Sequence, residues 1–412
     1  MRMFLFSASS ILALVSGCAI NSLGNLASSK TGDTSHLVTR SSPLKPLRQA
    51  CGANGAMRPE ASMIARKPYL QQVTTSSATF GWVTSAPGGQ SVVITKPETT
   101  DVIARADATR DNATDRVAGH TQMWTTTDPL EPDTVYCYQV MVNGVAVSEK
   151  IGFRTAPTAD STRTIGILAF GDSGSGNSDQ WALREQMEEV PYQLMIHTGD
   201  LAYEDGSMEN LEQNVFNVYD DLFRHIPFYP AAGNHDHHSS SAAPFREVFK
   251  LPENGDGEKW YSYDWGRIHF VALDTEADYK TQAKWLDEDL SKSNLPWKVV
   301  YLHRPPYSSG AHGSDTGLRT ILEPVINKHR VQLVLSGHDH NYERMKPHAK
   351  SGTQYIVTGG GGRGTYAVGT SSFTAFSSEV IHYVYIESDV DKMTLHAIDG
   401  EGREFDSVVI PR

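Results

Sequence analysis

The sequence predicts an all-β domain followed by a larger domain of layered α/β type. Between residues 64 and 156, short runs of β-branched and aromatic residues are separated by Pro, Gly, Asp and Asn, which is typical of strands joined by turns. From Thr164 onward, apolar strand-like runs alternate with helical segments, which favours sheets covered by helices. A chain of 412 residues is long enough for both domains.

The chain begins with features of an export signal. Arg2 supplies a positive charge, and Phe4–Val15 is apolar but too short to span a bilayer. The tetrapeptide that ends at Cys18 resembles the bacterial lipobox, in which the cysteine carries the lipid anchor. An ordinary secretory signal with a chance cysteine is the alternative. We predict a signal peptide at residues 1–17 and an outer-membrane lipoprotein or a periplasmic or secreted protein.

Residues 18–63 are predicted to form a lipid-anchored flexible leader, because they are rich in Ser, Thr, Gly, Asn and Ala and show no sustained apolar period. Two further cysteines are present, Cys51 in this leader and Cys137 in a predicted strand. Disulfides persist in exported proteins. A disulfide that ties the leader to the first domain is one prediction, and two unpaired thiols are the other.

Residues 64–156 are predicted to form a β-sandwich. Its clearest strands are Ser77–Val83, Gln90–Thr95 and Val135–Val142. Asn143-Gly144 follows the last of these and predicts a hairpin turn, because both residues tolerate positive φ. We see no cluster of chemically active side chains in this domain and expect a structural role for it.

The second domain, residues 164–412, opens with a buried strand at Ile165–Phe170 and a helix around Asp179–Glu189. Further strands are predicted at Tyr192–His197, Phe228–Ala232, Arg267–Leu273, Trp297–Tyr301, Val331–Ser336, Gln354–Thr358, Glu379–Glu387, Met393–Ile398 and Ser407–Ile410. Helices are predicted at Lys280–Ser291 and Gly317–His329.

The bulk charge excludes one class of partner. A formal net charge of −12 and a pI near 5.7 argue against a broad basic surface for nucleic acid. They do not exclude a small anionic substrate, because a metal site produces its own local positive field. Membrane attachment is expected only through Cys18, and the sequence does not indicate an oligomeric state.

Five short motifs follow apolar runs of the second domain, and each presents oxygen or imidazole ligands. They are Gly171-Asp172-Ser173-Gly174, Gly199-Asp200-Leu201-Ala202-Tyr203, Gly233-Asn234-His235-Asp236, Val300-Tyr301-Leu302-His303 and Gly337-His338-Asp339-His340. In open α/β sheets, the loops beyond the carboxyl ends of parallel strands gather in one cleft. Such ligands suit iron, manganese and zinc. The sequence therefore predicts a two-metal hydrolase.

The order of these motifs resembles the calcineurin-like metallophosphoesterases and, more narrowly, the purple acid phosphatases. The narrower mark is Tyr203 in Gly-Asp-x-x-Tyr, because related phosphoesterases generally lack that tyrosine. Residues 64–156 also resemble the fibronectin type III-like domain that precedes the catalytic domain in plant-type members. The resemblance covers roughly residues 64–410, and it implies a catalytic domain built as a layered β-sandwich flanked by helices.

The resemblance implies two ligand sets. The first metal would be held by Asp172, Asp200, Tyr203 and His340, and the second by Asp200, Asn234, His303 and His338, with Asp200 bridging. Carboxylate and phenolate oxygens suit iron(III), whereas Asn and two His suit a divalent ion such as zinc, iron or manganese. The implied reaction is hydrolysis of small phosphate monoesters, with release of phosphate, by a hydroxide that two metals activate.

Three more residues are candidates for catalysis. The resemblance assigns His235 to the phosphate or the leaving group and His312 to the substrate, where either could act as a general acid. Asp236, which is a candidate to orient His235 through a hydrogen bond, stands where the family usually has the longer Glu, and Gly313 stands where plant-type members often have a second His. These departures leave open a phosphodiester or a nucleotide pyrophosphate substrate. A non-enzymatic surface binding module with a vestigial metal site is the remaining alternative.

Several nearby residues receive structural interpretations. His197 either packs beneath the site as a donor or is a satisfied core histidine, and we favour the second. His237 and His238 are expected to be solvated loop residues. Arg344 is expected to hold a loop by an ion pair. The run Gly359–Gly362 precedes no Lys-Ser/Thr and is expected to be a crowded turn at the edge of the site.

Overall fold

The computed structural model describes residues 38, 40–52, 62–111 and 120–412. The predicted signal peptide, the lipobox cysteine Cys18 and most of the predicted leader lie outside the described residues. Within them, no helix has the length and apolar character needed to cross a membrane.

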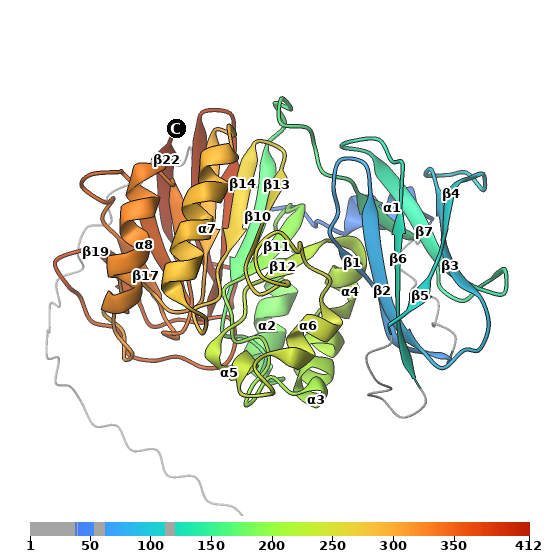
Figure 1. Cartoon of the computed structure of the whole chain (residues 1–412), viewed down its shortest axis with the longest axis horizontal. Helices are drawn as coiled ribbons and strands as arrows, with labels where there is room; N and C mark the ends of the chain where they lie inside the picture. Colours follow the sequence, from blue (N-terminus) through green and yellow to red (C-terminus); the bar gives the residue numbers. More distant parts are fainter. Residues whose placement is uncertain (1–37, 39, 53–61, 112–119) are drawn as a thin grey trace, which may run out of the picture. The chain divides into compact units, whose positions relative to one another are not determined.

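The first region is all-β, as predicted, and consists of two antiparallel sheets (Figure 1). One sheet has the order β1-β2-β6-β5, with β1 at Ile64–Gln71, β2 at Ala78–Thr84, β5 at Thr109–Arg110 and β6 at Thr121–Thr127. The other has the order β4-β3-β7-β8, and β9 also pairs with β7. Its strands are β3 at Gln90–Thr95, β4 at Val102–Asp107, β7 at Val135–Val142, β8 at Val145–Ala146 and β9 at Ile151–Arg154.

Two local features of this region were anticipated. Asn143 and Gly144 join β7 to β8 with φ values of 49° and 83°, which confirms the predicted hairpin turn. The short helix α1 (Lys45–Ala50) precedes Cys51, which forms a disulfide with Cys137 of β7. The disulfide alternative is therefore confirmed. The bond and the buried Leu44 and Leu47 fix α1 against the first region, which corrects the prediction that the leader is flexible as far as residue 63.

The second region has two mixed sheets with helices on their outer faces (Figure 1). The six-stranded sheet has the order β12-β11-β10-β20-β21-β22. Its strands are β10 at Ile165–Phe170, β11 at Leu194–His197, β12 at Phe228–Pro230, β20 at His382–Ser388, β21 at Lys392–Asp399 and β22 at Glu404–Pro411. Its first three strands are parallel, so the loops that follow them lie at one edge.

The seven-stranded sheet has the order β13-β14-β15-β16-β18-β17-β19. Its strands are β13 at Tyr261–Trp265, β14 at Ile268–Ala272, β15 at Trp297–Tyr301, β16 at Leu333–Ser336, β17 at Tyr342–Met345, β18 at Gln354–Thr358 and β19 at Thr374–Ser378. The helical elements of the region are α2 at Ser178–Met187, α3 at Met208–Leu211, the π-helix η2 at Glu212–Phe216, α4 at Asn217–His225, α5 at Asn234–His237, α6 at Ala243–Val248, α7 at Tyr279–Lys292 and α8 at Thr316–Lys328. The layered α/β class is confirmed.

Alternation along the central strands explains the layers. Val299 of β15 belongs to the core between the two sheets. Its neighbour Val300 belongs to a second core with Leu286 of α7 and Leu322 of α8. Because successive strand residues point to opposite faces, a continuous apolar run buries both faces of the sheet. This explains why α7 and α8 cover the outer face of the seven-stranded sheet (Figure 1).

The two regions share packing. The apolar core between the sheets of the second region continues into the first region and includes Tyr69 and Phe216. Arg66 of β1 is 5% exposed, donates to Glu212 of η2 at 2.9 Å and lies 4.0 Å from the centre of the Phe216 ring.

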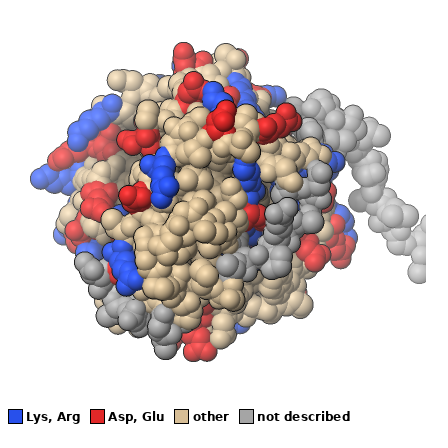
Figure 2. Space-filling model, turned by 90° about the vertical axis from the view of Figure 1, so that its right-hand side faces the viewer, with Lys and Arg blue, Asp and Glu red and all other residues tan. Residues whose placement is uncertain are grey.

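The face shown in Figure 2 carries basic and acidic side chains interspersed around a wide uncharged area.

Candidate metal centre

The predicted ligands follow the ends of five strands and lie in loops, except that Asn234 is the first residue of α5. Asp172 follows β10, Asp200 follows β11, Asn234 follows β12, and His303 and His338 follow β15 and β16. Three of these residues have positive φ, with values of 58° at Asp172, 54° at Asp200 and 69° at His338. Such backbone is uncommon for residues with a Cβ, and it recurs at active sites as well as in turns such as that of Asn143. The positive φ values are therefore consistent with a functional site but do not mark it by themselves.

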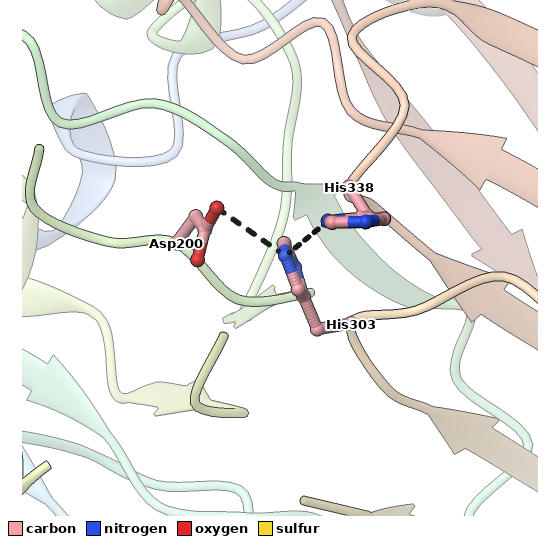
Figure 3. Close-up of side chains that lie close together, drawn as sticks. All are labelled: Asp200, His303 and His338. Atoms are coloured by element: carbon pink, nitrogen blue, oxygen red, sulfur yellow. Dashed lines mark hydrogen bonds and ion pairs between the residues drawn. The ribbon is translucent and has the colours of Figure 1, made fainter. Parts of the chain in front are cut away.

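Asp200, His303 and His338 form a compact trio in which one ligand atom from each residue lies within 4.8 Å of the others. Figure 3 shows the three side chains pointing toward one another from three loops. His303 Nε2 lies 3.3 Å from Asp200 Oδ2 and 3.1 Å from His338 Nδ1. Asn234 Oδ1 is 3.0 Å from the same His303 nitrogen. The four residues predicted for the second metal therefore converge on one point.

The residues predicted for the first metal converge on the Tyr203 hydroxyl. This oxygen lies 3.1 Å from each of Asp172 Oδ1, Asp200 Oδ2 and His340 Nε2. Burial and then the nearby carboxylates of Asp172 and Asp200 raise the pKa of Tyr203 well above its usual value. The structure thus brings all seven predicted ligands into one connected cluster, and Asp200 belongs to both halves of it.

The donor set fits metal ions because it holds more acceptor atoms than protons. The Tyr203 hydroxyl has one hydrogen for three neighbouring acceptors. His303 Nδ1 must donate to the Thr198 carbonyl at 3.0 Å, so in the neutral ring the Nε2 lone pair faces the trio. Burial lowers the pKa of His303, but Asp200 and Asp172 raise it more, to about 9. The site therefore favours positive charge, which divalent and trivalent ions supply.

Of the two candidate catalytic histidines, His235 lies beside the ligands. Its backbone N–H donates to Asp200 Oδ1 at 2.8 Å, and its Nδ1 donates to the Glu204 carbonyl at 2.5 Å. Its Nε2 lies 4.0 Å from Asp200 Oδ2. The Glu204 bond fixes the ring, so that Nε2 is the nitrogen directed toward the ligand cluster.

His312 lies beside His338, one of the ligands predicted for the second metal. Its ring packs against the His338 ring with centroids 4.2 Å apart and meets the edge of Tyr366 at 5.6 Å. The side chain is exposed. Both histidines therefore lie beside the ligand cluster, His235 next to Asn234 and His312 against His338. Contact with a bound substrate requires such positions.

Asp236 needs a correction. Its carboxylate is fully buried and accepts from Leu201 N at 3.0 Å and Gly233 N at 2.8 Å. Burial, followed by the charge of Asp200, raises its pKa. The expected bond to His235 does not form, because Glu204 holds that ring. Asp236 instead joins the loops of Asp200 and Asn234 beneath the site.

Comparison with known proteins agrees with this geometry. Residues 165–342 match the sequence profile of the family described as calcineurin-like phosphoesterase. The chain contains a calcineurin-like metallophosphoesterase domain. Purple acid phosphatase 23 of Arabidopsis thaliana is 30% identical over 57% of this chain and 61% of that protein. Acid phosphatase type 7 of Homo sapiens is 30% identical over 44% of this chain and 47% of that protein.

The fold of most of the chain has a solved counterpart. A purple acid phosphatase named PPD1 from yellow lupin seeds has a TM-score of 0.74 with 20% identity, over 84% of this chain and 75% of that one. This likeness concerns the fold. The resemblance to purple acid phosphatases is confirmed by these similarities, and the chain spans about half to three fifths of the length of the two relatives named above.

Three residues at the rim of the candidate metal centre were not anticipated. Arg304 pairs with Glu276 and reaches within 3.4 Å of His338 Nε2. Arg363 pairs with Glu204 and lies 5.0 Å from the centre of the Tyr203 ring. Tyr366 stacks on His340 at 4.1 Å. Arg304 directly follows His303 and Arg363 directly follows the glycine run, and this adjacency to the motifs was the only available signal.

The remaining predictions near the candidate metal centre have mixed outcomes. His197 is a satisfied buried histidine, as favoured, and its partners Ser173 Oγ at 3.0 Å and Gly199 N at 3.2 Å belong to two ligand loops. His237 was expected in solvent, which is wrong, since its Nε2 pairs with the buried Asp274 at 3.0 Å. His238 is exposed as predicted.

Two predictions of structural roles are confirmed. Arg344 forms an ion pair with Asp406 at 2.6 Å. The glycine run is a crowded turn, because a Cβ at Gly361 would lie 2.2 Å from the Gly171 carbonyl oxygen. This close approach holds the turn against the loop of Asp172.

Proposed function

We propose that this protein is an acid-phosphatase-type phosphomonoesterase that uses two metal ions and acts outside the cytoplasm. The observation that carries the proposal is the convergence of seven side chains on two points that share Asp200. The phosphoesterase family match and the named relatives support hydrolysis of phosphoesters. The export-like beginning of the sequence supports the location.

The two halves of the cluster suit different ions. Asp172, Asp200 and Tyr203 offer hard oxygen ligands beside His340, which suits iron(III). Asp200, Asn234, His303 and His338 suit zinc, iron or manganese as a divalent ion. When bound, such ions would stabilise negative charge on a phosphoryl group and lower the pKa of nearby water.

The side chains around the cluster would position and protonate the substrate. His235 donates its Nδ1–H to the Glu204 carbonyl, so Nε2 carries a second proton only in the imidazolium form, and in that form it can donate to a phosphate oxygen or to the leaving oxygen. The guanidinium groups of Arg304 and Arg363 flank the two halves of the cluster and add positive charge for an anionic substrate. His312 is exposed against His338 and can contact the ester group.

A phosphodiester or nucleotide pyrophosphate substrate is the second candidate, and one observation favours it. A Cβ at Gly313 would meet no atom within 4 Å, and the residue has a φ of 74°. The loop beside His312 therefore leaves open space where a larger second ester group could lie. The burial of Asp236 also removes one carboxylate from the substrate side.

The deciding experiment compares initial rates on p-nitrophenyl phosphate and bis-p-nitrophenyl phosphate, with metal-replete protein, from about pH 4 to about pH 9. Asn234→Ala serves as the site variant and Ser262→Ala, a buried hydroxyl that donates to Asp289, as the matched distant control. Faster monoester cleavage that is lost only in Asn234→Ala supports the proposal. Faster diester cleavage favours the second candidate, and no cleavage of either ester rejects both.

A further inference from the structure

The loop at residues 308–314, which carries His312, is bound to two buried carboxylates on the neighbouring chain segment. Asp339 Oδ1 accepts from His312 N at 2.7 Å, and its other oxygen accepts from the Ser308 hydroxyl. Glu343 accepts from Ser309 N at 2.6 Å and from the Ser309 hydroxyl at 2.8 Å. The loop is therefore attached at its first residues and again at His312 itself.

These attachments are strong because the carboxylates have few other partners. Asp339 and Glu343 are both fully buried. Across the described residues, neither forms an ion pair with Lys, Arg or His. A buried carboxylate is costly unless hydrogen bonds satisfy it, and bonds from N–H or O–H groups to an ionised oxygen are stronger than neutral ones. Moving the loop would leave the charge of Asp339 without its donors.

The backbone of the loop also lies unusually close to Asp339. A Cβ at Gly310 would come within 2.5 Å of Asp339 Cγ and 2.6 Å of Asn341 Nδ2. A residue with a side chain would therefore push the loop away from the carboxylate. Ser308 Oγ also accepts from Gly310 N at 2.9 Å. The Ser308 hydroxyl therefore holds the turn through its own backbone as well as through Asp339.

We propose that Asp339 is a positioning residue that holds His312 in contact with substrate at the metal centre. Asp339 lies in the chain between the predicted ligands His338 and His340, yet its carboxylate bonds to the loop. The same segment thus presents ligands to the metal site and fixes the histidine that packs on His338. This inference rests on the proposed function, because it assigns His312 to the substrate.

The test compares Asp339→Asn and Ser308→Ala with His312→Ala and the double variant Asp339→Asn/His312→Ala, all in the full chain. Ser308→Ala alters the loop side only, so it remains informative if Asp339→Asn folds poorly. Ser262→Ala, which removes a hydroxyl bond to Asp289, is the matched control. Measured quantities are bound metal per chain, amide hydrogen exchange over residues 308–314, and kcat and KM on p-nitrophenyl phosphate across pH.

We expect unchanged metal content and exchange of the His312 amide faster by about 10-fold in Asp339→Asn and Ser308→Ala. We expect kcat/KM to fall about 10-fold in Asp339→Asn, but less than about 2-fold when the change is added to His312→Ala, because residues acting as a unit are not additive. Losses that multiply in the double variant would overturn the proposal, as would unchanged exchange. If the wild type cleaves no phosphoester, the proposed function fails, and exchange at His312 still decides whether Asp339 holds the loop.

Discussion

His269 makes the stability of the phosphoesterase domain depend on pH in a direction that the structure fixes. The residue is 6% exposed and lies between two carboxylates. Its Nδ1 is 2.7 Å from Asp264 Oδ1, and its Nε2 is 2.7 Å from Asp289 Oδ2. Both ring nitrogens must donate, so the ring is an imidazolium. Burial lowers its pKa, but the two carboxylates raise it more, from 6.5 to about 9.

The shift gives the size of the effect. At roughly 1.4 kcal/mol per pKa unit, the rise corresponds to about 3 kcal/mol. The Asp264 side chain is 62% exposed, so solvent screens that half of the interaction and we expect about 2 kcal/mol. The pKa is higher in the folded than in the unfolded chain. The stabilisation is therefore fully present below pH 6.5 and is lost as the pH rises through about 9.

The assay is denaturant unfolding of the wild type and His269→Gln at about pH 5.5 and about pH 10. The difference in unfolding free energy between the two proteins should shrink by about 2 kcal/mol at the higher pH. His329→Gln is the matched control for the His-to-Gln change, because its partner Asp287 is 36% exposed and also pairs with Lys328. If the difference in unfolding free energy between the wild type and His269→Gln stays constant or grows with pH, the ring is not an imidazolium that donates to both carboxylates.

Four further changes test the site and its support. Tyr203→Phe should abolish the visible absorption of iron-loaded protein, since no phenolate remains; colour retained at equal iron content would contradict that ligand role. Asn234→Ala should lower metal content from about two ions to about one per chain by elemental analysis, because only the second set loses a ligand; two ions retained would argue against it. His235→Ala should keep its metals but turn over about 10²-fold more slowly, and an equal loss of metal would instead mark it as structural. Cys51→Ser should lower the free energy of unfolding by about 2–4 kcal/mol, because the disulfide to Cys137 closes a long loop; an unchanged denaturation midpoint would mean that the leader contributes no stability.

Strands with a clear apolar signal could be located from sequence almost to the residue. Gln90–Thr95 and Ile165–Phe170 have the bounds that were predicted, because each is a short apolar or β-branched run ended by turn residues. The strand β13 was missed, since its sequence Tyr-Ser-Tyr-Asp-Trp mixes polar and aromatic residues. The segment Glu212–His225 was missed as well, although Val215, Val218 and Leu222 recur at helical spacing on its buried face.

The identities of the candidate ligands could be predicted, but their supporting contacts could not. Asp236 was expected to orient His235, and its actual partners are the amides of Gly233 and Leu201. The hydrogen-bond partners of a buried carboxylate depend on which backbone N–H groups the fold places around it. A sequence motif does not contain that information. Arg363 pairs with Glu204, 159 residues away, and such a pair has no local signature.

The same chemistry recurs around the site, where carboxylates in one loop hold the backbone of another. Asp172 accepts from His338 N at 2.9 Å, and Asp200 accepts from His235 N at 2.8 Å. Asp339 accepts from His312 N at 2.7 Å. The loops are far apart in sequence, and these bonds fix their mutual positions where strained backbone at Asp172 and Asp200 would otherwise relax.

Asp200 therefore has two roles, as a predicted metal ligand and as the acceptor of the His235 amide. A variant that removes its carboxylate disturbs both. Alanine in place of Asp200 would remove the predicted shared metal ligand and also the acceptor of the amide that places His235. Asparagine keeps an acceptor for that amide while it removes the charge. The loss of activity in an alanine variant consequently overstates the contribution of the metal contact, and the asparagine variant isolates it. Metal content and loop exchange, measured beside the rate, separate the two roles.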